Sequence, residues 1–222
     1  TPDEAFEAIY TAEYAWRLQQ SGPSEDGPKS ERLALPDVGV KAQTARLAAW
    51  EKVEKQLAAI DVARLSPENR INFSVYKGQI DAFVASQRYR DYEKPFNADT
   101  SFWGELADWA RSPLRDQQSA EDFVEMLREI PRYYDQQIDN MRAGLKRGFS
   151  APQVTLIGRD KGIELVVDAK TAEDSPFYEP FRKLPSTIPA AEQEKLRAAA
   201  RAAITGSVVP AHAKLLAFMR GE

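Results

Sequence analysis

The chain has 222 residues, of which 43% are hydrophobic and 29% charged, a balance typical of globular proteins. Its formal net charge is −4, from 34 acidic and 30 basic residues, so we expect no broad basic surface and no nucleic-acid partner. It has no cysteine and a single histidine, His212, which excludes disulfides, cysteine nucleophiles and zinc sites made of cysteines or paired histidines. No apolar run approaches the roughly 18 residues of a membrane-spanning helix, and we predict no span.

Three helices are predicted in the first part of the chain. Residues 3–20 have a helical pattern, with apolar side chains near one side. Residues 21–39 are rich in Gly, Pro and Ser, which predicts a connecting loop. Residues 40–60 carry apolar side chains at steps of three and four, the pattern of an amphipathic helix. Ser66 followed by Pro67 is typical of a helix N-cap with proline at the first helical position, so the third helix is predicted to begin there.

The middle of the chain combines an irregular segment with the longest predicted helix. Residues 92–113 are aromatic and rich in turn residues, which predicts a packed irregular segment containing one short helix. From Ser119 to Leu145, apolar side chains recur at steps of three and four. Pro131 lies inside this stripe, and we expect it to kink the helix. Gly148 and the basic residues before it are typical of a helix C-terminus.

The last third of the chain is also predicted to be helical. Residues 150–153 resemble a capping box, which predicts a helix from there to about residue 169. Residues 173–190 contain four prolines and are predicted to be mostly loop. A last helix is predicted to begin near Ala190, to be interrupted at Pro210, and to resume as far as Arg220.

These patterns predict an all-α protein. No strand-like alternation extends far enough to indicate a sheet, and no internal repeat is found. We expect an irregular multi-helix array with long Pro- and Gly-rich loops, in which residues 1–222 form a single helical region. An apolar stripe still runs through Phe218 and Met219 near Glu222, and we expect the natural protein to continue beyond this point, although a natural end with a frayed terminus is the alternative.

The sequence shows none of the common catalytic motifs. HExxH, the G-x-S-x-G elbow, the phosphate-binding loop and the calcium-binding EF-hand loop are all absent. A di-iron bundle would need Glu-x-x-His pairs, but Val209 stands three residues before His212. We therefore predict no catalytic, metal-binding or cofactor-binding residue in this chain, and the substrate-binding residues are not identified. Whether the chain acts as an enzyme is left open.

His212 lies on the apolar stripe of the last predicted helix. A buried, hydrogen-bonded histidine explains this position best, because a lone imidazole has no partner ligands for a metal. A pH-sensitive interface contact is the alternative. The basic cluster at the end of the longest helix, which is Arg142, Lys146 and Arg147, is predicted to be a solvated helix end.

Aromatic side chains between residues 96 and 134 could serve the core or a ligand. Packing in the core is the favoured interpretation, since aromatic rings fill cores more often than grooves. An apolar pocket between helices that binds a small ligand is a weaker hypothesis. The residues concerned are Phe102, Trp103, Trp109, Tyr133 and Tyr134.

Several segments, in this order and spacing, resemble one known family. The most specific is the long predicted helix followed by GFSAPQ, residues 148–153. The others are EAIYTAEYAWRLQQSGP, SPENRINFSVYKGQIDAFV, FNADTSFWGELADWARSP, SPFYEPFRKLP and SVVPAHAKLLAFM. Together they resemble the N-terminal part of the bacterial family called domain of unknown function 885, over nearly the whole chain.

This resemblance carries expectations of its own. Members of the family resemble zinc-dependent metallopeptidases of the HExxH type with a largely helical fold, and many resemble exported, periplasmic or lipid-anchored proteins. Their zinc ligands lie in a C-terminal half, so no catalytic residue of the family is assigned to this sequence, and zinc is implied for the longer protein only. The resemblance thus implies a non-catalytic N-terminal region that forms part of the wall of a substrate cleft. Its expected partners are the C-terminal half and a peptide substrate. The alternative is a stand-alone helical protein-interaction module without catalytic activity.

Overall fold

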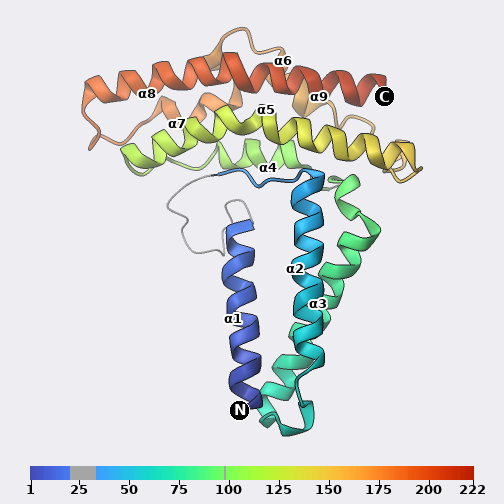
Figure 1. Cartoon of the computed structure of the whole chain (residues 1–222). Helices are drawn as coiled ribbons and strands as arrows, with labels where there is room; N and C mark the ends of the chain where they lie inside the picture. The colour runs from blue at the N-terminus through green and yellow to red at the C-terminus, as the bar shows by residue number, and fades with distance from the viewer. Residues whose placement is uncertain (21–33, 98) are drawn as a thin grey trace. The chain divides into compact units, whose positions relative to one another are not determined.

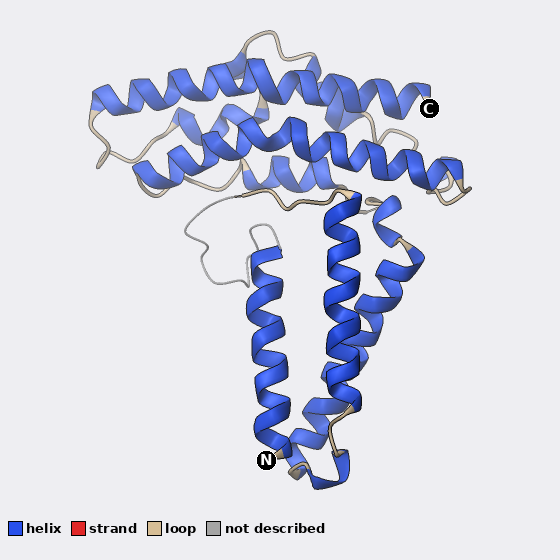
Figure 2. Cartoon of the chain, viewed as in Figure 1, coloured by secondary structure: helices blue, strands red, loops and turns tan. Residues whose placement is uncertain are grey.

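The computed structural model describes residues 1–20, 34–97 and 99–222, and the predicted loop at residues 21–39 lies largely outside them. The described residues form helices and loops and contain no β-strand, apart from an isolated bridge between Phe96 and Ser101 (Figure 2). The predicted all-α fold is confirmed. The chain divides into two compact units, residues 1–22 with 37–92 and residues 23–36 with 93–222. That residues 1–222 are one region of a longer protein stays a prediction.

The described part of the first unit contains three long helices (Figure 1). As predicted, Ser66 caps the third: its Oγ accepts a hydrogen bond from the Asn69 N–H at 3.2 Å. Pro67 occupies the first helical position, where its missing N–H is not needed. The elements are α1 (Pro2–Gln20), α2 (Val40–Ala58), the 3-10 turn η1 (Val62–Arg64) and α3 (Pro67–Tyr89), with a further 3-10 turn, η2 (Asp91–Glu93), at the boundary between the units.

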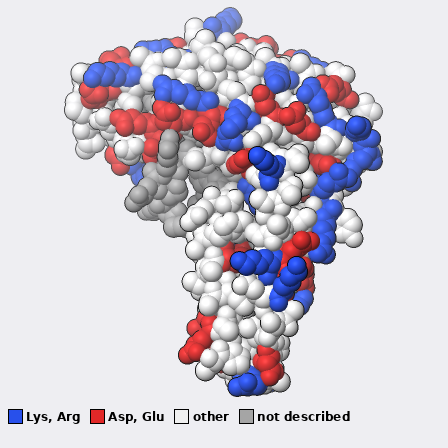
Figure 3. Space-filling model, viewed as in Figure 1, with Lys and Arg blue, Asp and Glu red and all other residues white. Residues whose placement is uncertain are grey.

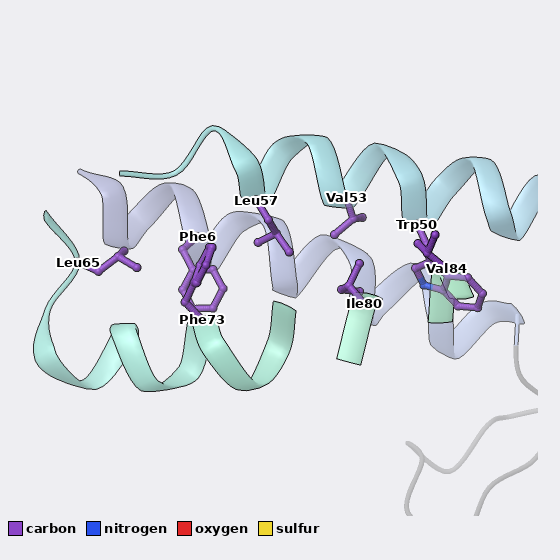
Figure 4. Close-up of a cluster of buried hydrophobic side chains, with 8 residues drawn as sticks. All are labelled: Phe6, Trp50, Val53, Leu57, Leu65, Phe73, Ile80 and Val84. Atoms are coloured by element: carbon purple, nitrogen blue, oxygen red, sulfur yellow. The ribbon is translucent and has the colours of Figure 1, made fainter. Parts of the chain in front are cut away.

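The apolar stripes of these three helices form the core of the first unit (Figure 4). Phe6 of α1 packs against Phe73 of α3, with ring centroids 5.5 Å apart. Trp50 of α2 lies 4.9 Å from the ring of Phe83 on α3. The periodicity of residues 40–60 therefore identified the buried face of α2 correctly. The fully assigned core cluster is Phe6, Trp50, Val53, Leu57, Leu65, Phe73, Ile80 and Val84.

A buried carboxylate joins the helices of the first unit. Glu13 on α1 is only 4% exposed. Its Oε1 accepts hydrogen bonds from Trp50 Nε1 on α2 and from Arg17 Nε, each at 3.0 Å. Its Oε2 accepts a hydrogen bond from the Tyr76 hydroxyl on α3 at 3.1 Å. Burial and the nearby Glu13 carboxylate raise the pKa of Tyr76, so this hydroxyl keeps the proton that it donates.

The second unit is built on two long helical runs, which lie side by side and point in the same direction (Figure 1). One run is α5 and the other is formed by α8 and α9, joined through a π-helical turn. Shorter elements connect and cover them. In chain order the elements are α4 (Phe102–Trp109), α5 (Gln117–Lys146), η3 (Gln153–Thr155), α6 (Lys161–Val167), η4 (Ala172–Asp174), η5 (Pro176–Tyr178), α7 (Glu179–Arg182), α8 (Ala190–Ala203), the π turn η6 (Ile204–Val208) and α9 (Val209–Gly221).

The start of α5 differs slightly from the prediction. Asp116 is its N-cap, and the Asp116 Oδ1 accepts a hydrogen bond from the Ser119 N–H at 2.8 Å. In return, Ser119 Oγ accepts one from the Asp116 N–H at 3.0 Å, so Ser119 is the third residue of a capping box and not the first residue of the helix. Pro131 does not end the helix, which continues to Lys146.

The prediction of one helix from residue 150 to about residue 169 is wrong. The structure has the short turn η3, then a turn at Gly158, and only then α6. Gly158 has a φ of 80°, a left-handed conformation that glycine adopts readily and that a continuous right-handed helix does not allow. Ser150 therefore does not cap a helix.

The predicted interruption at Pro210 takes the form of a π turn just before the proline, and the helical run does not break. Between α8 and α9 the backbone widens into the π turn Ile204–Val208, and the Val209 N–H donates to the Ile204 carbonyl five residues earlier. In a regular α-helix the ring of Pro210 would clash with the carbonyl four residues before it, and proline has no N–H to donate. A wider turn immediately before Pro210 relieves that clash, so α8 and α9 form one continuous run.

Gly144 is a point of close packing on α5. A Cβ at this position would lie 2.6 Å from the Phe149 carbonyl oxygen and 2.7 Å from the Glu93 carbonyl oxygen, and both are backbone atoms. We expect Gly144→Ala to lower the free energy of unfolding by about 1 to 3 kcal/mol, because the backbone must shift. Thermal unfolding measures this change. Gly162→Ala is the matched control, since its Cβ would meet only Trp103 Nε1, at 3.9 Å. Equal stability of the two variants would contradict the prediction.

Candidate functional site

The second unit contains a pocket of about 450 Å³, lined by the C-terminal end of α5, the turn that follows it and the last residues of α9. Its volume falls within the roughly 300–1,000 Å³ of small-molecule sites, which are mainly apolar with a few polar groups. The apolar side chains that line it include Phe96, Met141, Leu145, Leu156, Phe218 and Met219.

The end of α5 shapes one wall of this pocket. As predicted, the helix ends just before Gly148, whose φ of 73° suits glycine. The Phe149 N–H donates to the Gly144 carbonyl at 2.8 Å and the Gly148 N–H donates to the Leu145 carbonyl at 3.0 Å, the two hydrogen bonds of a Schellman motif. This motif turns the chain back on itself and places Phe149 and Ser150 in the pocket wall.

Most charged side chains around the pocket are held in ion pairs. Arg142 donates to both carboxylate oxygens of Glu222, at 2.8 and 2.5 Å, and lowers the pKa of Glu222. The carboxylate of Glu93 is buried and pairs with Arg147. Positive and negative side chains also lie next to one another on the face shown in Figure 3. The pairs at the pocket are Arg142–Glu222, Arg147–Glu93, and Arg220 with Asp160 and Glu164.

The sequence predicted that the basic cluster at the end of α5 is only a solvated helix end. The structure shows more, because two of its three side chains form ion pairs. Arg142 and Arg147 each neutralise a carboxylate from a distant part of the chain. These partners become visible only in the folded structure. A sequence pattern gives the position of a charge along a helix but not its long-range partner.

Lys94 differs from the other cations at the pocket. Its side chain is exposed, and within residues 1–20, 34–97 and 99–222 it belongs to no ion pair. Its Nζ lies 4.5 Å from the centroid of the Phe149 ring, while the guanidinium carbon of Arg147 lies 4.2 Å from the same ring. A cation–π contact at an exposed site is weak, about 0.5 to 1 kcal/mol. The ammonium group thus remains available to an anion that enters the pocket.

His212 lies in the core of the second unit and is 1% exposed. Its Nδ1 is 2.8 Å from the Val208 carbonyl oxygen, and its Nε2 is 3.0 Å from the Tyr134 hydroxyl. Because a carbonyl can only accept, Nδ1 carries the proton, and Nε2 accepts a hydrogen bond from Tyr134. Burial lowers the pKa of His212 to about 4, so the ring is neutral at physiological pH. The structure thus has the buried, hydrogen-bonded histidine that the sequence favoured.

The residues that the structure describes do not fit the zinc ion that the resemblance implies for the longer protein. Both ring nitrogens of His212 are engaged in hydrogen bonds, and a metal ligand needs a free nitrogen lone pair directed at the ion. Among the described residues, no group of three or more His, Cys, Asp or Glu side chains is arranged to hold a metal ion.

The aromatic residues singled out from the sequence lie mainly in the core. Phe102, Trp103, Tyr133 and Tyr134 are buried, and Trp109 is partly buried. The ring of Phe102 packs edge-on against Tyr134, with centroids 5.3 Å apart. The favoured interpretation, packing in the core, is confirmed for the four buried rings. Phe96 is the aromatic residue of that stretch that reaches the pocket.

Among the described residues, one helical run, Ala190–Gly221, is long and apolar enough to cross a membrane by length and composition. A core helix of a globular protein passes the same test, and several residues of this run, including Leu196, Ile204 and Leu215, are buried within the second unit. The sequence predicts an interruption at Pro210, and therefore two shorter helices in place of this run. The absence of a membrane span stays a prediction.

Comparison with known proteins gives the family. A family described as "Bacterial protein of unknown function (DUF885)" matches residues 24–222, which include all of the second unit that the structure describes, together with α2 and α3. A search of curated proteins found no match. The match covers far more than half of the chain and includes the GFSAPQ turn at the pocket. The chain therefore belongs to the bacterial family DUF885.

Proposed function

We propose that this chain is a non-catalytic helical region of a metallopeptidase-like hydrolase and forms part of the wall of its substrate cleft. The observation that carries the binding role is the open, mainly apolar pocket at the end of α5 and α9. The reaction class rests on the resemblance of the family to HExxH peptidases. The zinc ion and its ligands would belong to a C-terminal half of the same protein, which we propose as the partner of this chain. Export or lipid anchoring is part of the same proposal.

The burial and hydrogen bonds of His212 support the proposal that this chain binds substrate and that the proposed C-terminal half carries the catalytic groups. A catalytic histidine must reach substrate or metal, whereas His212 is buried and holds Tyr134 and the Val208 carbonyl. The contribution of this chain is therefore a shaped surface, and the chemistry takes place on groups that it does not supply.

Metal content tests this proposal. We expect the 222-residue chain to bind no stoichiometric zinc, and the protein purified from its source cell to contain zinc and to hydrolyse peptides until a chelator removes the metal. Elemental analysis measures the zinc content, and a peptide-hydrolysis assay measures the activity. The intact mass of the source protein shows whether it exceeds the 24.9 kDa of these 222 residues. Zinc held tightly by three side chains of this chain would refute the proposal.

A second candidate is a stand-alone helical interaction module. It is favoured by exposed apolar side chains one helical turn apart on α3, where Ile71 is 68% and Val75 is 70% exposed. The same measurements separate the two candidates. A source protein of the same mass as this chain, without zinc and without peptidase activity, would favour the interaction module.

A further inference from the structure

We infer that the pocket at the end of α5 binds an apolar group that carries a carboxylate, with Lys94 as the residue that recognises the anion. Two sources of this chemistry fit: the C-terminal residue of a short peptide and the acyl chain of a fatty acid. The inference names the chemistry of the substrate and so deepens the proposed function. It rests on that proposal for the assignment of the pocket to a hydrolase.

The charge arrangement favours an anion. Glu93 and Glu222 line the pocket, but Arg147 and Arg142 neutralise their side chains, so these side-chain carboxylates repel a negative ligand less than free ones would. The ammonium of Lys94 lies against an aromatic ring and belongs to no ion pair within the described part of the chain. It is therefore the charge at this pocket that a ligand can pair with.

The pocket walls favour an apolar group beside that anion. Phe96 and Leu156 provide rigid apolar surface, and Met141 and Met219 provide flexible thioethers that adapt to different shapes. Leu145 is 41% exposed, so part of this surface faces water when the pocket is empty. Covering it with an apolar ligand is favourable, by roughly 25 cal/mol per Å² of surface removed from water.

The three methionines provide a direct test. Met141 and Met219 line the pocket, whereas Met126 is 0% exposed and does not line it. In the chain labelled with ¹³C-methyl methionine, we expect N-acetyl-alanyl-phenylalanine or decanoate to shift the NMR signals of Met141 and Met219 in a saturable way. The signal of Met126 should stay unchanged and serves as the internal control. The two ligands distinguish a peptide source from an acyl source.

Recognition of the anion is tested by paired ligands and variants. We expect the peptide amide, or decanol, to bind more weakly than the acid, and Lys94→Gln to weaken binding of the acid about fivefold and to abolish this difference. Because Lys94 is exposed, the variant should fold normally. Leu145→Glu places a negative charge in the wall and should abolish binding, whereas Leu165→Glu, at an exposed apolar residue that does not line the pocket, should leave binding unchanged.

Each outcome decides the inference. Saturable shifts that depend on Lys94 support the inference, and the acid that binds more tightly identifies the source. Absence of saturable shifts for both acids, or equal binding of acid and neutral analogue, overturns it. These measurements need neither metal nor hydrolysis. A negative binding result would therefore not refute the proposed function, which the zinc assay tests separately. Likewise, failure of the zinc assay would not alter the binding result.

Discussion

Lowering the pH from 7 to about 4.5 is expected to reduce the free energy of unfolding by about 2 to 3 kcal/mol through His212 alone. Burial lowers the pKa of His212 from 6.5 to about 4 in the folded protein. Between these values the unfolded chain takes up a proton that the folded protein does not, so stability falls as the pH falls. The contribution is fully present above pH 6.5 and is lost as the pH approaches 4.

Because His212 is the only histidine, the experiment has a clean control. His212→Gln keeps an oxygen that can accept the Tyr134 hydrogen bond but does not titrate. We expect this variant to be less stable at pH 7 and to show a smaller pH dependence of urea unfolding between pH 6.5 and 4.5. Carboxylates are the same in both proteins and cancel in the comparison. An NMR titration of the imidazole that shows a pKa near 6.5 in the folded protein would contradict the prediction.

Replacing Glu13 by alanine is expected to lower the free energy of unfolding of the first unit by about 3 to 5 kcal/mol. The change removes the acceptor for Trp50 Nε1, Arg17 Nε and the Tyr76 hydroxyl, and it leaves these donors in or near the core without their partner. Since the carboxylate joins α1 to α2 and α3, hydrogen exchange should rise first in α1. Chemical unfolding and hydrogen–deuterium exchange measure the two effects.

Two further substitutions separate the causes. Glu13→Gln keeps the shape and one acceptor oxygen but removes the charge, so we expect a loss between that of alanine and wild type. Glu7→Ala, on the same helix but at an exposed residue with one long hydrogen bond of 3.4 Å from Asn69, should change stability by no more than about 0.5 kcal/mol. If Glu13→Ala were as mild as Glu7→Ala, the carboxylate would not hold the three helices together.

The sequence predicted the long helices well, because local signals and packing agree there. The stripe in residues 40–60 and the Ser66–Pro67 start both correspond to observed elements. Helix ends at Gly148 and the burial of His212 were also predicted, since a left-handed turn and an apolar face are local properties. Family membership was recognised from the order of these same segments.

The sequence predictions are wrong or missing where residues far apart in the chain determine the local structure. A capping-box pattern at residue 150 did not start a helix, because that segment turns at Gly158 instead. The pocket could not be predicted, since it joins residues near 94, 145 and 220 that are far apart in the chain. The only signal was the GFSAPQ turn, which marks the end of α5 but does not reveal what packs beside it. Likewise, the buried Glu13 looks like any surface carboxylate until Trp50 and Tyr76 approach it.

The π turn at Ile204–Val208 has a consequence for how this protein tolerates changes in length. Leu196, Ala200, Ile204 and Val208 are spaced by four residues and are all buried. In a regular α-helix, at about 100° per residue, three such steps would rotate the last side chain by about 120° away from the first. The wider turn takes up part of this rotation, as a one-residue insertion would, and keeps His212 directed at Tyr134. A deletion of Gly206 would thus leave α9 in register, because Val208 would follow Leu196 by eleven residues, a rotation of only about 20° in regular helix. Its cost would come from Pro210, whose ring would again meet the carbonyl four residues before it. A one-residue deletion elsewhere in α8 would instead rotate α9 by about 100°.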